Sequence, residues 1–299
     1  MKPAPIDPSG YNSFRTVLPA LLCLTIIFLS NFLSRIIFAP FLPVIEHELG
    51  ISHTDSGSFF LFISSGYFLS ILMSGFVSSL ISHKQTIVLS TIANGTILCL
   101  LSFTGSLLTL RIGLFCLGLS AGLYLPSGLA TILRVVSPGY LARGMAIHEL
   151  APNIGFVLVP LISTLLLSHF SWSRSLLFIG IALISIGIIY YLSKPPETGY
   201  GKRPDFSSCV TILKNGEFWL LVLMFTLAIC STLGLYTMLP LFLVADRNID
   251  LAHANTIIAL SRVSSVFMPL VGGWAGDRFS HRGVMLIVII SGGRLTVPM

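Results

Sequence analysis

Three arginines lie inside long apolar stretches of the sequence, where a charged side chain is costly. Arg35 follows Asn31 by about one helical turn, Arg111 begins the segment RIGLFCLGLSAG, and Arg262 lies within a stretch that begins at Ala252. A guanidinium at the centre of a bilayer costs at least about 2.5 kcal/mol, so it usually faces the protein interior. Its planar fork suits a carboxylate or a comparable oxyanion. We therefore predict that the three arginines, and Asn31 on the helical face of Arg35, contact a small anionic substrate.

Each arginine also has an interpretation that needs no substrate. Arg111 lies within two turns of the end of its stretch, where its long side chain could extend to the membrane surface. Arg35 could donate to backbone carbonyls. Arg262 lies near the middle of its stretch, where extension to the membrane surface and donation to backbone carbonyls are both harder to achieve. Because the apolar stretches hold no acid outside residues 144–167, we expect a bound anion, rather than a protein carboxylate, to offset these charges.

A histidine and a glutamate, His148 and Glu149, lie near the start of the stretch 144–167. An imidazole titrates near about pH 6.5, and the two neighbouring groups could carry protons. We predict proton coupling from this pair. The alternative is that both side chains lie at the headgroup level, with Glu149 stabilised by the positive end of the helix dipole.

The composition places these residues in a membrane protein. Of the 299 residues, 54% are hydrophobic and 9% are charged, and the mean hydropathy is +0.93; an ordinary soluble domain has about 25% charged residues. The net charge of +6 is spread singly between apolar stretches, which argues against nucleic-acid binding. The five cysteines lack metal-ligand spacing, and the sequence shows no hydrolase, phosphate-loop or metalloprotease motif. We expect no enzymatic activity, no cofactor and no metal.

Eight stretches are long and apolar enough to cross a bilayer as helices, which takes about 20 residues each. They cover residues 16–45, 56–81, 85–103, 107–135, 144–167, 173–192, 218–244 and 252–275. A ninth begins near residue 283 and is interrupted after about residue 290 by Gly292, Gly293 and Arg294. The predicted fold class is an all-α integral membrane protein built as a helical bundle.

Lysine and arginine gather on one side of the predicted bundle. With the N-terminus inside, the inner connections hold eleven of them, whereas the outer ones hold Arg174 and Arg247. The positive-inside rule then predicts a cytoplasmic N-terminus. The sequence shows no cleavable signal peptide. We predict a multi-pass protein of the plasma (inner) membrane, surrounded by the lipid bilayer.

Two ten-residue segments that follow apolar stretches share the same ends. GFVSSLISHK begins at Gly75 and GWAGDRFSHR begins at Gly273, and each ends with serine, histidine and a basic residue. The second segment resembles the loop that joins helices 2 and 3, and again helices 8 and 9, in the major facilitator superfamily of secondary transporters. The resemblance covers nearly the whole chain. It implies two six-helix halves that rock about a central site, with helices 1 and 4 lining the cavity and helix 8 bordering it.

The resemblance also implies a gating role for these segments, because in the family their acid helps to hold the outward-open state. The matching positions are Gly75, His83 and Lys84 in the first copy, and Gly273, Asp277, Arg278 and Arg282 in the second. The first copy has Ser79 where the second has Asp277, and Leu80 where it has Arg278. We therefore expect a weaker or differently built first latch. The alternative is that these charges only set the topology.

The longest polar segment, residues 193–217, carries three prolines and mixed charge. It is predicted to be a cytoplasmic linker between a six-helix half, residues 1–192, and a partial second half, residues 218–299, with helices 7, 8 and part of 9. By the resemblance, about three more helices would follow. A frameshift near Gly292, where VMLIVIISGG gives way to RLTVPM, would explain a truncated chain.

The sequence thus favours a permease that moves a small anion, such as a carboxylate, by alternating access, with proton symport if His148 and Glu149 titrate. One alternative is a drug or metabolite efflux permease. The family's drug antiporters end helix 5 with Gly-Pro-x-x-Gly-Gly, whereas this chain has VPLIS at residues 159–163. The other alternative is a remnant that does not transport.

Overall fold

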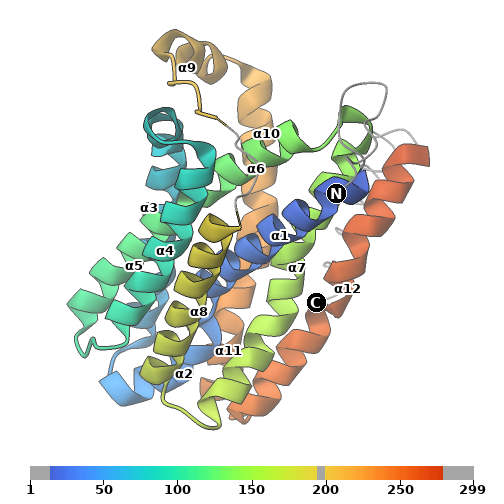
Figure 1. The fold of residues 1–299 in the computed structure, drawn as a ribbon. Coiled ribbons are helices and arrows are strands. Elements are labelled where there is room, and N and C mark those ends of the chain that lie inside the picture. The colour runs from blue at the N-terminus through green and yellow to red at the C-terminus, as the bar shows by residue number, and fades with distance from the viewer. Residues whose placement is uncertain (1–13, 194–198, 279–299) are drawn as a thin grey trace.

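The structure is a computed structural model that describes residues 14–193 and 199–278, and all regular secondary structure in these ranges is helical. We call residues 14–193 the first half. It contains α1 (Phe14–Ile36), α2 (Phe38–Leu49), α3 (His53–Leu80), α4 (His83–Leu101), α5 (Leu107–Gly122), α6 (Tyr124–Val135), α7 (Leu141–Leu167) and α8 (Trp172–Leu192). We call residues 199–278 the second half. It contains α9 (Phe206–Leu213), α10 (Gly216–Ile229), a π-helical turn η2 (Cys230–Gly234), α11 (Leu235–Ala245) and α12 (Leu251–Arg278). Figure 1 shows the long helices side by side in one bundle.

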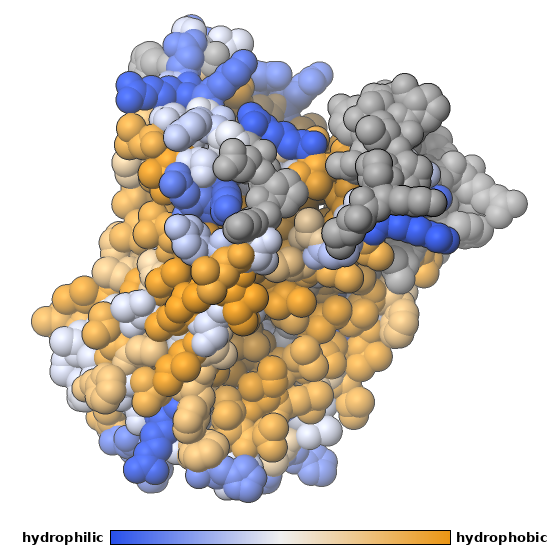
Figure 2. Space-filling view, in the orientation of Figure 1, coloured by the Kyte–Doolittle hydropathy of each residue, from blue (hydrophilic) through white to orange (hydrophobic). Residues whose placement is uncertain are grey.

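Within the described residues, seven helical segments are long and apolar enough to cross a membrane, and they match the first seven predicted stretches. The first joins α1 to α2, the fourth joins α5 to α6, and the seventh joins α10 to α11. Helix α12, with 28 residues, takes the place of the eighth. An apolar surface fills the middle of the molecule in Figure 2, with hydrophilic residues toward both ends. The predicted ninth stretch and the change of sequence near Gly292 lie outside the described residues.

Two of the composite segments are broken next to a proline. Helix α1 ends at Ile36, and Pro40 follows four residues later; α5 ends at Gly122, and Pro126 follows four residues later. A proline has no backbone N–H, so it cannot complete the hydrogen bond to the carbonyl four residues before it. The sequence had predicted continuous helices here, and the structure shows a break one turn before each proline, at Ile37 and Leu123.

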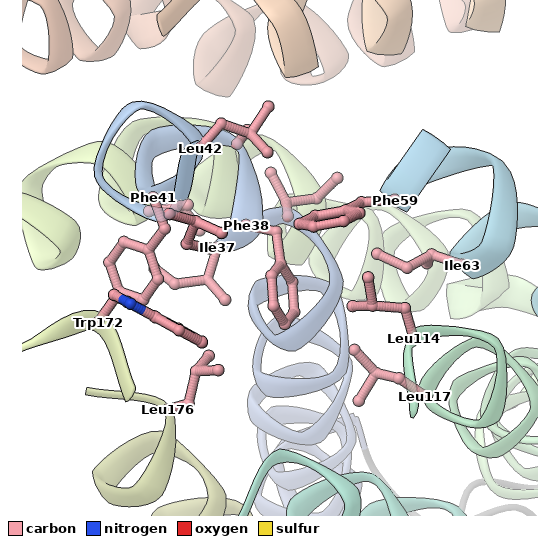
Figure 3. Close-up of a cluster of buried hydrophobic side chains, with 14 of the residues drawn as sticks. Ile37, Phe38, Phe41, Leu42, Phe59, Ile63, Leu114, Leu117, Trp172 and Leu176 are labelled. Atoms are coloured by element: carbon pink, nitrogen blue, oxygen red, sulfur yellow. The ribbon is translucent and has the colours of Figure 1, made fainter. Parts of the chain in front are cut away.

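The first six segments pack closely around an apolar core. A Cβ atom added at Gly118 of α5 would lie 2.1 Å from the carbonyl oxygen of Ile63 in α3, so glycine is required where these helices cross. The largest buried cluster joins α2, α3, α5 and α8 through side chains such as Phe38, Phe59 and Trp172 (Figure 3). This packing gives the first half a rigid frame for the residues that face the second.

The second half touches the first mainly through two pairs of helices. Helix α12 lies along α7, and α11 lies along α2 (Figure 1). None of the described side chains of α10 is buried. We call the end with the α3–α4 turn and α9 the linker end, and the end with the α2–α3 turn the opposite end. The halves therefore contact each other toward the opposite end, where α11 packs on α2.

Candidate functional site

Arg35 lies in the last turn of α1 and faces aromatic rings. Its guanidinium carbon lies 4.2 Å from the ring centre of Tyr67 in α3 and 5.7 Å from that of Phe32. Its Nε is buried and has no hydrogen-bond partner among the described residues. Cation–π contacts partly offset the cost of removing a guanidinium from water, but they leave the donors of Arg35 available for an acceptor.

Arg262 lies near the middle of α12 and contacts both halves of the fold. Its guanidinium carbon lies 5.2 Å from the ring centre of Phe156 in α7 and 5.5 Å from that of Tyr236 in α11. Its Nη2 donates to the carbonyl of Thr232 at 3.3 Å. Thr232 belongs to η2, a π-helical turn inserted between α10 and α11, and such turns are frequent at functional sites.

Three aromatic side chains connect the surroundings of the two arginines. The ring centres of Phe32 and Phe156 are 5.0 Å apart, and those of Phe156 and Tyr236 are 4.7 Å apart, each pair edge to face. We call Phe32, Phe156 and Tyr236 the aromatic bridge. It runs from α1 through α7 to α11, so it joins the two halves of the protein, with half-buried Arg35 next to Phe32 and half-buried Arg262 next to Phe156 and Tyr236.

Among the described residues, neither arginine has a carboxylate to neutralise it. The ion pairs in the described part of the chain join His53 to Glu46, Arg111 to Asp55 and His148 to Glu149. Arg35 and Arg262 therefore have no carboxylate oxygen within 4.0 Å among the described residues. The arrangement leaves two guanidinium groups in an apolar region without a carboxylate partner among the described residues, and each of them suits an oxyanion.

Arg111, by contrast, has a protein partner. Its Nη2 donates to a carboxylate oxygen of Asp55 at 2.8 Å, and its Nε donates to the hydroxyl of Ser58 at 3.0 Å. Both partners lie near the start of α3. Helix α3 begins at His53, so Asp55 lies in its first turn. The expectation that a bound anion, rather than a protein carboxylate, offsets the charge is therefore wrong for Arg111. Because this contact accounts for Arg111 without a substrate, the site proposed below does not include it.

Asn31 also makes a packing contact. Its side chain is 2% exposed, and its Nδ2 donates to the carbonyl of Ala121 in α5 at 3.1 Å. The carbonyl of Asn31 accepts from Ser34, whose hydroxyl in turn accepts from Asn94 of α4. These bonds hold α1 against α4 and α5, and they use the amide that was predicted to contact substrate.

His148 is fully buried in a polar contact between three helices. Its ring stacks on Phe28 of α1 at 4.4 Å, and its Nε2 lies 3.1 Å from the hydroxyl of Tyr124 in α6. That hydroxyl donates to the carbonyl of Leu24 at 2.7 Å, so the network assigns the ring proton to Nε2, which donates to Tyr124. Nδ1 has no hydrogen bond, and Oε1 of the half-exposed Glu149 lies 3.7 Å away. Among the described residues, Nδ1 therefore has no hydrogen-bond partner and faces only the Glu149 carboxylate.

The first copy of the predicted gating segment covers the end of α3 and the start of α4. Gly75 lies within α3, while His83 and Lys84 open α4, so only Ile81 and Ser82 separate the helices. His83 is buried, with Nδ1 3.3 Å from the hydroxyl of Ser127 in α6. The Nζ atom of Lys84 lies 5.9 Å from the ring centre of Tyr191. These contacts hold the segment on the first half itself.

Part of the linker lies on this segment. The backbone N–H of His83 donates to the carbonyl of Gly199 at 3.0 Å, and that of Gly201 donates to the carbonyl of Ser78 at 2.7 Å. We call residues 199–204 the linker strap. The strap satisfies a backbone donor at the start of α4 and a backbone acceptor at the end of α3, groups that helix termini leave without intrahelical partners.

The second copy is described only in part. Gly273, Asp277 and Arg278 belong to the last turns of α12, which continues three residues beyond its predicted end at residue 275. Arg282 lies outside the described residues. The gating role of this copy stays a prediction.

The sequence did not indicate the aromatic bridge, because phenylalanine is common in apolar helices and its type alone does not reveal a contact. Phe32 precedes Arg35 by three residues, a spacing that places both on one helical face. Phe156 and Tyr236 are each followed four residues later by a proline, in the segments FVLVP and YTMLP. These spacings could have drawn attention to all three residues.

The chain matches the family model of the Major Facilitator Superfamily over residues 24–298. It is 22% identical over 276 residues to the membrane sensor protein UhpC of Salmonella typhimurium, a match that covers 83% of this chain and 62% of that protein. It is 21% identical over 298 residues to the probable sulfoacetate transporter SauU of Cupriavidus necator, covering 90% of this chain and 69% of that protein. The chain thus spans less than two thirds of the length of the first of these relatives.

A solved structure shows the same fold. The bacterial homologue of the human lysosomal transporter Spinster, in an inward-facing and occupied conformation, superimposes with a TM-score of 0.73 at 18% identity. The match covers 91% of this chain and 63% of that one. With the family match over residues 24–298 and the helical bundle described above, it follows that the chain belongs to the Major Facilitator Superfamily of membrane transporters.

Proposed function

We propose that this transporter moves a small anion by alternating access, and that Arg35 and Arg262 bind the anion between the two halves of the protein. One observation carries the proposal. Two guanidinium groups from different halves lie at the aromatic bridge, and neither has a carboxylate within 4.0 Å among the described residues. An anion between them would offset two charges that are otherwise costly in an apolar interior.

The arrangement also fits the transport cycle. A ligand can stabilise the approach of two halves only if it makes contacts that depend on their relative position. Arg35 belongs to α1 and Arg262 to α12, so an anion held by both would connect the halves near the opposite end. Release toward the linker end would follow when the halves separate there.

The chemistry of the site favours an oxyanion with at least two acceptor oxygens. Carboxylates, sulfonates and phosphates all offer such oxygens to a planar guanidinium. One relative is named a probable sulfoacetate transporter, and sulfoacetate carries both a carboxylate and a sulfonate. Sulfoacetate, inorganic phosphate and lactate are therefore suitable first probes.

Binding can be tested on the purified chain in detergent. An anion that binds the folded protein raises its melting temperature, by an amount that grows with the logarithm of the ligand concentration over Kd, and we expect such a shift with at least one of the three probes. Arg35→Gln and Arg262→Gln should each weaken binding by about 10- to 100-fold, because each removes charge-assisted hydrogen bonds. Arg174→Gln is the matched control, since Arg174 is exposed at the start of α8.

Transport is tested by uptake of the same probe into proteoliposomes. Arg262→Gln should abolish uptake while leaving the yield of purified protein normal. Retained uptake in Arg262→Gln, or anion binding that is equal in wild type and both variants, would overturn the proposal. The control variant separates loss of the site from a general loss of positive charge.

We further propose that uptake is coupled to protons through His148. The supporting observation is the unpartnered Nδ1 of this buried ring, 3.7 Å from Glu149, with Nε2 held by Tyr124. Protonation would place a second N–H on the ring, directed at the Glu149 carboxylate. The test is whether an imposed pH gradient accelerates anion uptake into proteoliposomes.

A further inference from the structure

The hydroxyl of Tyr236 forms a hydrogen bond to the backbone of the other half. It donates to the carbonyl of Phe156 at 3.1 Å, and the Tyr236 side chain is 1% exposed. The bond connects α11 to α7 near the point where Arg262 stacks on both rings. It is a buried, directional contact between the two halves.

The acceptor is available because of Pro160. In a regular helix the N–H of residue 160 would donate to the carbonyl of residue 156, but proline has no N–H. Pro160 lies within α7, so the Phe156 carbonyl has no intrahelical donor at this position. A buried carbonyl without a partner is unfavourable, and the hydroxyl of Tyr236 provides the missing donor.

Helix α11 has the same arrangement on its side of the contact. Pro240 lies within α11 four residues after Tyr236, so it cannot donate to the Tyr236 carbonyl. Each of the two helices is therefore interrupted by a proline one turn after the aromatic residue that meets the other helix. Such interruptions let a helix bend locally, and here both lie at the cross-half contact.

We propose that Tyr236 is a positioning residue of the transport cycle, which holds α11 on α7 through the carbonyl that Pro160 leaves free and so stabilises closure of the opposite end. The inference rests on the alternating-access part of the proposed function, but it does not depend on an anionic substrate. Loss of the bond should favour separation of the halves at the opposite end. It should do so even when no ligand is present.

Closure can be measured by the labelling of a cysteine placed between the halves. Leu241 of α11 is 6% exposed and borders a groove with Pro43 of α2 and Ile51. Leu241→Cys, introduced after the five native cysteines are replaced by serine, should react with a water-soluble maleimide only when α11 separates from α2. The rate is measured in proteoliposomes without added anion.

Tyr236→Phe removes the hydroxyl and keeps the ring, so we expect it to raise the labelling rate by about 3- to 10-fold, the range that corresponds to one net hydrogen bond. Pro160→Ala should raise it to a similar extent, because a regular N–H then competes for the Phe156 carbonyl. The double variant should label no faster than the faster of the two, since both changes act on one bond.

Two matched controls isolate this bond. Pro152→Ala removes another proline from α7 without affecting the Phe156 carbonyl, and Tyr190→Phe removes the hydroxyl of another buried tyrosine. Both should label at the parent rate. If Pro160→Ala does not fold, the labelling rate of Tyr236→Phe compared with that of Tyr190→Phe still tests the role of the Tyr236 hydroxyl.

The proposal is overturned if Tyr236→Phe labels at the parent rate, if Pro152→Ala accelerates labelling as much as Pro160→Ala, or if the two effects multiply in the double variant. Because no probe anion is added in this assay, its result is independent of the binding test. Failure of anion binding with accelerated labelling in Tyr236→Phe would reject the anion site and retain the role of Tyr236.

Discussion

Phe32 and Phe156 meet edge to face with ring centres 5.0 Å apart, and this contact joins the ring beside Arg35 in α1 to the ring beside Arg262 in α7. Phe156 makes a second edge-to-face contact with Tyr236 at 4.7 Å. It is therefore the central member of the aromatic bridge, and its removal affects both halves.

We expect Phe156→Leu to destabilise the protein by about 1–3 kcal/mol, because it removes two aromatic pairs as well as the ring on which Arg262 stacks. The melting temperature in detergent measures the loss. Phe68→Leu is the control, since Phe68 is 64% exposed in α3. If the two variants melt alike, the bridge does not contribute to stability beyond ordinary packing.

The ion pair between Arg111 and Asp55 should stabilise the packing of α5 on α3 without contributing to anion binding. Both side chains are about one third exposed, at 28% and 36%, so a double-mutant cycle with Arg111→Gln and Asp55→Asn should give a coupling of about 0.2–1 kcal/mol. The coupling should shrink at high salt. If Arg111→Gln weakens anion binding as much as Arg262→Gln, the exclusion of Arg111 from the site is wrong.

The sequence was sufficient to predict the helical class and the approximate limits of the spans. A long apolar stretch in a bilayer must satisfy its backbone hydrogen bonds internally, and a helix does so within one segment. It also singled out Arg35 and Arg262, since charge is rare in such stretches. It could not predict the aromatic bridge, which depends on how three helices far apart in the chain are rotated relative to one another. Phenylalanine is too common in these helices to indicate a contact by type alone.

Asp55 was missed for a different reason. It lies just before the predicted stretch 56–81, so it is not among the acids within the apolar stretches. In the structure, Asp55 lies in the first turn of α3 and forms a capping box with Ser52. Ser52 three residues before an acid is a recognisable helix start. Applying that rule would have placed the carboxylate on the helix and within reach of Arg111.

His148→Asn should remove the response to a pH gradient. We expect an inward-directed proton gradient to accelerate anion uptake in wild type and to have no effect on this variant, while exchange of the anion at equal pH persists, because amide groups do not titrate in this range. Tyr124→Phe should reduce the response by about 3- to 10-fold, since it removes the partner that orients the ring.

His169→Asn provides the control for this prediction, because His169 is exposed beyond the end of α7. Uptake is followed in proteoliposomes with the same probe anion at two gradients. A response to the gradient in His148→Asn equal to that of wild type would exclude His148 as the coupling group.

The linker strap should protect the chain from trypsin at Lys202. A Cβ atom at Gly201 would lie 2.3 Å from the hydroxyl oxygen of Ser78, so Gly201→Val should detach the strap and break its bonds to Ser78 and His83. Cleavage requires the backbone to leave its bound conformation. We therefore expect cleavage after Lys202 to accelerate about tenfold or more, as judged from two backbone hydrogen bonds of about 1 kcal/mol each.

Gly139→Val is the matched control, because Gly139 lies between α6 and α7 and a Cβ atom there has nothing within 4 Å. Its cleavage rate should equal that of wild type. Equal rates in Gly201→Val and wild type would mean that the strap is not held in solution. Accelerated cleavage in Gly201→Val alone would instead show that the linker stabilises the α3–α4 turn, in the copy of the gating segment where Ser79 and Leu80 replace the acid and the arginine of the second copy.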